Sequence, residues 1–171
     1  MGSMKEAIDA CKVLLDACPA FREIVGSDID PLTRIHWRSV AANPVGIEEE
    51  FTPDQLANIR PCATLAHGTF SQSQSAMGLW PCNGSIEVTV LQNVDEEDLI
   101  SDFLVDAEAE LDWVKKCDRL LADVRKIGIE ASGLVAHTIS VLLEPGAASR
   151  EEMQKCGPFY GFRFLIEYGS K

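Results

Sequence analysis

The sequence predicts an α+β fold, in which a mostly antiparallel sheet is covered on one face by a long amphipathic helix and an N-terminal helix. Residues 85–94 alternate between apolar and polar, the pattern of a half-buried strand. Residues 95–128 and 4–17 instead repeat apolar residues at helical spacing. Alternating strands are typical of antiparallel sheets with one covered face, and amphipathic helices are suited to cover it.

The N-terminal third predicts two helices followed by a strand. The first helix spans Met4 to Ala17, because its apolar residues recur every three or four positions. Pro19 suits the first turn of a second, short helix, and Gly26 suits its end. A strand is then expected from Arg34 to Val40, followed by a Pro- and Glu-rich loop over residues 41–61.

The remaining elements are strands on either side of the long helix. Strands are expected at 63–70 and 85–94, with a polar loop at 71–75 between them. One helix of about 30 residues should follow, because acidic residues crowd its first turn and Gly128 suits its end. Two further strands are expected, at 135–143 and 160–168, joined by a long connection that starts at Glu144-Pro145-Gly146.

Composition limits the class of protein. The 171 residues carry a formal net charge of −12 and suit one domain over residues 4–171, with Met1-Gly2-Ser3 interpreted as a cloning scar. No basic cluster is present, so direct, sequence-specific nucleic-acid binding is not expected. No apolar run has the roughly 18 residues that a membrane helix needs. The six cysteines form no Cys-x-x-Cys pair and are interpreted as reduced thiols.

The sequence predicts no catalytic residue, cofactor or metal, and therefore not an enzyme. Two alternatives remain open: a zinc site built from histidines and cysteines, and a thiol nucleophile pairing Cys62 with His67 or His137. No histidine has standard ligand spacing, and buried cysteine is usually a small apolar residue. The carboxylates of the long helix are interpreted as its solvated face. The candidate ligands of the zinc site are His36, His67, His137, Cys62 and Cys82. The carboxylates of the solvated helix face are Asp102, Asp106, Glu108, Glu110 and Asp112.

Residues 61–94 are almost uncharged, since Glu87 is their only charged residue. The segment nevertheless contains large apolar side chains around a polar loop. It is either a core hairpin or a subunit interface, because interface centres lose charge and gain aromatic residues and Met. In the second interpretation the candidate anchors are Phe70, Met77, Leu79 and Trp80.

The pattern resembles the phage tail terminator, or tail completion, proteins of long-tailed bacteriophages. Leu14-Leu15-Asp16 to Pro31, with Phe21-Arg22-Glu23-Ile24-Val25-Gly26 and then Arg34-Ile35, is similar to that family's opening. The strand at 85–94, the long helix and the closing strand at 160–168 match its order of elements. The resemblance implies a homo-oligomeric ring, usually of six subunits, that caps the tail tube, meets the head connector and lets DNA pass. It implies a virion protein made in the host cytoplasm.

Two other functions remain open from the sequence. A non-catalytic adaptor that binds another protein predicts an exposed apolar patch without self-association. A small-molecule-binding or enzymatic domain predicts a deep apolar pocket lined by His36, His67 or His137.

Overall fold

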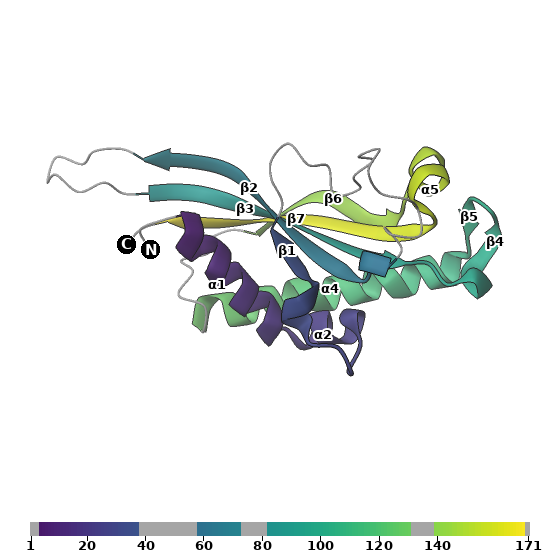
Figure 1. Ribbon diagram of the computed structural model, residues 1–171, viewed down its shortest axis with the longest axis horizontal. Coiled ribbons are helices and arrows are strands. Elements are labelled where there is room, and N and C mark those ends of the chain that lie inside the picture. Colours follow the sequence, from purple (N-terminus) through teal and green to yellow (C-terminus); the bar gives the residue numbers. More distant parts are fainter. Residues whose placement is uncertain (1–3, 38–57, 73–81, 131–138, 170–171) are drawn as a thin grey trace, which may run out of the picture.

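The computed structural model describes residues 4–37, 58–72, 82–130 and 139–169. In Figure 1 the helices α1 (Met4–Ala17), α2 (Pro19–Val25) and α4 (Ala107–Glu130) lie on the same side of the main sheet. The α+β class predicted from the sequence is confirmed. The elements are α1 (Met4–Ala17), α2 (Pro19–Val25), the 3-10 helix η1 (Pro31–Arg34), β1 (Ile35–Trp37), β2 (Cys62–Gln72), β3 (Cys82–Asn93), the 3-10 helix η2 (Glu96–Asp98), β4 (Leu99–Ser101), β5 (Leu104–Val105), α4 (Ala107–Glu130), β6 (Ile139–Ala147), α5 (Arg150–Cys156) and β7 (Phe159–Gly169).

The main sheet has the strand order β1-β2-β3-β7-β6. All neighbouring strands are antiparallel except β1, which runs parallel to β2, so the sheet is mixed. Strand β3 lies at the centre and pairs along its whole length with β7, from Asn83–Gly169 to Asn93–Phe159. The predicted strands 63–70, 85–94 and 160–168 are therefore present, and each is slightly longer than expected.

The two N-terminal helices form where the sequence predicts them. Pro19 occupies the first turn of α2, and Gly26 ends the helix with φ of +106°, a value that glycine adopts readily. The first N–H groups of α2 need acceptors, and Asp123 of α4 supplies one, since its Oδ2 accepts from Ala20 N at 2.8 Å. The strand predicted at 34–40 begins one residue later, at Ile35, and its continuation beyond residue 37 lies outside the described residues.

The prediction of one helix over 95–128 is wrong at both ends. Residues 95–105 form η2 and the small β4–β5 pair, and α4 begins only at Ala107. Asp106 starts the helix, because its Oδ2 accepts from Glu108 N at 3.0 Å and Ala109 N at 3.4 Å. The helix then continues through Gly128 to Glu130 without a break. Helical spacing alone does not reveal that 95–106 lies before the cap.

The connection predicted from residue 144 is also more ordered than expected. Strand β6 continues through Pro145 and Gly146 with two register shifts, and a helix, α5, follows. Glu110 of α4 holds this part of β6, because its Oε1 accepts from Ala147 N at 3.0 Å. The Ser149–Glu152 capping box starts α5. Part of the predicted strand 135–143 and the loop 41–57 lie outside the described residues.

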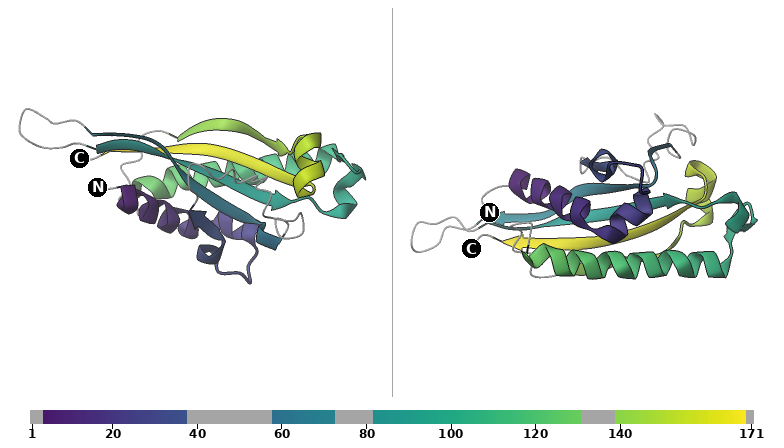
Figure 2. Two further views of the ribbon diagram at one scale, coloured as in Figure 1. Left: turned by 45° about the horizontal axis from the view of Figure 1, so that its top comes forward. Right: turned by 90° about the horizontal axis from the view of Figure 1, so that it is seen from below.

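The core lies between the sheet and helices α1, α2 and α4. Alternate residues of the strands point towards the helices, and their side chains are almost fully buried. They include Leu65, Val88, Phe162, Phe164 and Ile166. In Figure 2, α4 runs alongside the sheet, and α1 lies on the other part of the same face. This arrangement agrees with the contacts of α4 with β6 and β7, and of α1 with β2 and β3.

Candidate functional site

The residues predicted to anchor an interface are only partly described. Phe70 lies in β2 opposite Gly84, next to the irregularity after His67. Met77, Leu79 and Trp80 lie outside the described residues. Ser71 and Gln72, expected in a polar loop, instead continue β2. In Figure 1 the C-terminal end of β2 and the N-terminal end of β3 lie at one end of the molecule, beyond the first turn of α1.

The sheet has two unlike edges. Strand β1 pairs only with Ala63–Leu65, and no described strand pairs with the rest of β2 on that side. At the opposite edge, β6 pairs only with β7 within the described ranges. Unpaired edges present backbone N–H and C=O groups to any chain that can pair with them.

The sheet face opposite α1, α2 and α4 is mixed, because charged and polar side chains lie there beside a small buried apolar cluster of Cys62, Leu91 and Phe159. Glu87 and Arg163 lie on neighbouring strands there, with Arg163 Nε 3.5 Å from Glu87 Oε1. A cavity of about 270 Å³ opens on this face, where Thr89, Leu91 and Arg163 meet the end of β6 and α5. The ion pair between Arg163 and Glu87 is partly exposed, so it contributes little to stability, roughly 0–1 kcal/mol.

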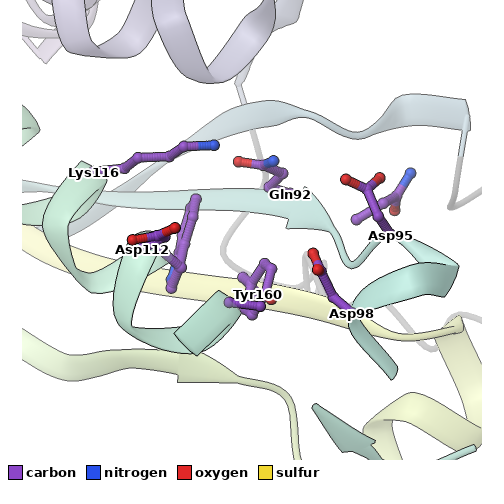
Figure 3. Close-up of a pocket in the computed structure, with 9 residues that line it drawn as sticks. Gln92, Asp95, Asp98, Asp112, Lys116 and Tyr160 are labelled. Carbon is purple, nitrogen blue, oxygen red and sulfur yellow. The ribbon is translucent and has the colours of Figure 1, made fainter. Parts of the chain in front are cut away.

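A second cavity, of about 200 Å³, lies between α4, the end of β3 and β7. Figure 3 shows Lys116 and Asp112 on one side of it, Asp95 and Asp98 on the other, and Gln92 and Tyr160 between them. The remaining lining residues are Asn93, Ala109 and Trp113. We call this cavity the acidic pocket, because three carboxylates and one ammonium group line it.

The residues that line the acidic pocket come from different elements. Gln92 is the last residue but one of β3, and Tyr160, the second residue of β7, lies opposite it in register. The indole of Trp113, on α4, stacks on Tyr160 with ring centroids 5.5 Å apart, and its Nε1 donates to Gly161 O at 3.4 Å. Asp98 ends η2, where its backbone oxygen accepts from Asp106 N at 2.8 Å.

The polar groups of the acidic pocket are incompletely satisfied. Tyr160 is 4% exposed, and its hydroxyl has no hydrogen-bond partner in the described part of the chain. The buried Gln92 Oε1 has none either. Such groups are rare, because each costs about 1–3 kcal/mol when left unpaired. Burial, followed by the nearby Asp98 and Glu110 charges, raises the pKa of Tyr160 to about 12, so the phenol stays protonated.

The carboxylates predicted to form one solvated face have different surroundings. Asp106 caps α4 and Glu110 holds β6, as described above. Asp112 lines the pocket and accepts from Lys115 Nζ at 2.9 Å, which lowers the pKa of the Asp112 carboxyl. Asp102, Glu108 and Asp112 are exposed, as a solvated face requires, although Asp112 also lines the pocket. Sequence reasoning missed the pocket, because Gln92 and Tyr160 come together only through the pairing of β3 with β7.

The structure separates one of the pairs that sequence reasoning left open for thiol chemistry. Cys62 and His67 lie in the same strand, five residues or roughly 17 Å apart. They also point to opposite faces, because side chains alternate along a strand. His67 Nε2 instead lies 3.0 Å from the Tyr168 hydroxyl. His36 is exposed, and His137 lies outside the described residues.

The four cysteines whose surroundings are described are buried free thiols: Cys11, Cys18, Cys62 and Cys117. Burial raises the pKa of Cys62 to about 11 and the pKa of Cys11 and of Cys18 to about 12. Each is therefore the neutral thiol near pH 7, which is a poor nucleophile.

Among the described residues, no three His, Cys, Asp or Glu side chains gather closely enough to hold a metal ion. Neither cavity described above is lined by a histidine. None of the helices described is both long and apolar enough to cross a membrane. No protein-family model matches the sequence, and no curated protein matches it.

Proposed function

We propose that this chain is a structural virion-assembly protein that resembles a phage tail terminator. In this proposal its copies join head to tail into a ring that caps the tail tube and connects it to the head. The observation that carries the proposal is the open sheet with two unlike edges, unpaired within the described residues.

Unlike edges favour a ring over a two-fold dimer. The edge of β2 beyond Leu65 and the outer edge of β6 are different surfaces, so a contact between them is heterologous. A heterologous contact repeats around a closed ring when its rotation closes. Adding the β6 of one copy to the β2 of the next satisfies backbone groups at both edges.

Charge is compatible with DNA passing through such a ring. The chain has a formal net charge of −12, and phosphate binding depends on clustered Lys and Arg. A surface that repels phosphate lets DNA pass without holding it. The face of the sheet that α1, α2 and α4 leave uncovered carries Glu87 and Arg163, and it is a suitable lining for such a passage.

Electron microscopy of the purified protein, alone and mixed with tail tubes, tests the proposal. We expect closed rings, or caps at one end of the tubes. The double variant Phe70→Ala/Trp80→Ala should abolish them if the charge-poor segment anchors the contact. Ile100→Ala is the matched control, because this residue is 64% exposed in β4, outside the five-stranded sheet. Well-folded particles that stay single, with tubes left uncapped, would instead favour the adaptor function.

A further inference from the structure

Several polar groups of the acidic pocket lack a partner in the described part of the chain. Asp95 and Asp98 have no ion-pair partner within the described residues, and Gln92 Oε1 and the Tyr160 hydroxyl have no hydrogen-bond partner there. Lys115 already engages Asp112 from outside the cavity. With Asp112 paired in this way, two carboxylates of the lining, Asp95 and Asp98, face the single positive charge of Lys116.

A metal ion does not match this arrangement. In the described part of the chain, no three carboxylate, imidazole or thiol groups come together as a ligand set. The unpartnered groups include an amide oxygen and a phenol beside two stacked aromatic rings. Aromatic rings favour organic cations, and a guanidinium group has five N–H donors in one plane.

We propose that the acidic pocket binds a guanidinium group. The cation donates to Asp98, to Gln92 Oε1 and to the Tyr160 oxygen, and it neutralises the surplus negative charge. The cavity of about 200 Å³ admits the end of an arginine side chain but not a large molecule. The group comes either from an arginine of an adjoining protein subunit or from a free small molecule. The proposal does not depend on the ring.

N-acetyl-arginine amide is the probe, and the Trp113 indole N–H signal in a heteronuclear NMR titration is the readout. We expect saturable binding with a dissociation constant on the order of 1 mM, as suits a ligand of this size. N-acetyl-citrulline amide has the same shape without the charge, and it should not bind. Absence of a saturable shift with the arginine probe would overturn the proposal.

Two variants separate binding from folding. Asp98→Asn should weaken probe binding about tenfold, the effect of losing a charge-assisted hydrogen bond. Glu97→Gln is its matched control, since Glu97 is exposed in the same 3-10 turn but does not line the pocket.

Tyr160→Phe keeps the ring stacked on Trp113 and removes only the hydroxyl. It should weaken binding several-fold without lowering the melting temperature, whereas a purely structural hydroxyl would affect melting and leave binding unchanged.

The oligomer mass identifies the source of the group. If it is an arginine of a neighbouring copy, Asp98→Asn and excess probe will both dissociate the oligomer. If it belongs to a free molecule, the mass will not change while the probe still binds. A monomeric chain that binds the probe would support the pocket and contradict the ring. An oligomer unaffected by Asp98→Asn, with no probe binding, would contradict the pocket alone.

Discussion

At the scale of single residues, burial separates two leucines that the sequence treats alike. Leu111 and Leu120 both follow the apolar period of the long helix, but Leu111 is 53% exposed and Leu120 is fully buried. Helical spacing identifies an apolar face without showing which of its residues another element covers. Leu111 is two residues from the buried Trp113, which places it on the other side of α4 from the face that packs against the core.

Replacing these two leucines tests the core. Leu120→Ala should lower the free energy of unfolding by about 2–5 kcal/mol, because it removes buried methyl groups and leaves a cavity. Leu111→Ala should change it by no more than about 0.5 kcal/mol. Urea denaturation at fixed protein concentration measures both. Equal losses would mean that the face assigned to the core is wrong.

The thiols supply a pH-dependent prediction. Burial raises the pKa of Cys11 and Cys18 from 9.0 to about 12, so the folded protein binds more protons than the unfolded chain between these values. Stability should therefore be complete below about pH 9 and fall as the pH rises further. Both thiols should resist a thiol reagent at pH 8 until the protein unfolds. Rapid labelling of either cysteine in the native protein would show that it is not buried.

At the scale of elements, the sequence predicts most strands and the two N-terminal helices better than it predicts where the long helix starts. Strands 85–94 and 160–168 alternate clearly, and Pro19 and Gly26 mark the limits of α2. Residues 95–105 keep an apolar period close to that of a helix, yet they form η2 and the β4–β5 pair. Asp106 determines where α4 starts, because its side chain caps the helix. In the sequence, nothing distinguishes Asp106 from the neighbouring acidic residues, since only its hydrogen bonds identify it as the cap.

Removing that cap is expected to destabilise α4. Asp106→Ala loses two acceptor contacts to the first turn, and it should cost about 1 kcal/mol. Asp102→Ala removes the same charge at an exposed position outside the helix, so it is the matched control. Thermal unfolding of the two variants side by side checks the difference. A helix that began at residue 95 would respond no more to Asp106→Ala than to the control.

At the scale of the whole molecule, the layer arrangement follows from the sequence but the acidic pocket does not. Alternation and amphipathicity predict a sheet with one face covered, and the structure has this arrangement. The parallel pairing of β1 with β2 and the meeting of Gln92 with Tyr160 depend on contacts between distant segments. No local pattern encodes such contacts, so reasoning from periodicity misses them.

Ring formation is the central claim at this scale, and light scattering coupled to size-exclusion chromatography tests it most directly. The monomer mass is 18.7 kDa. A closed ring predicts one fixed integer multiple of that mass, unchanged over a hundredfold range of concentration or reached when tail tubes are added. A mass of 18.7 kDa at every concentration, with and without tail tubes, would contradict it.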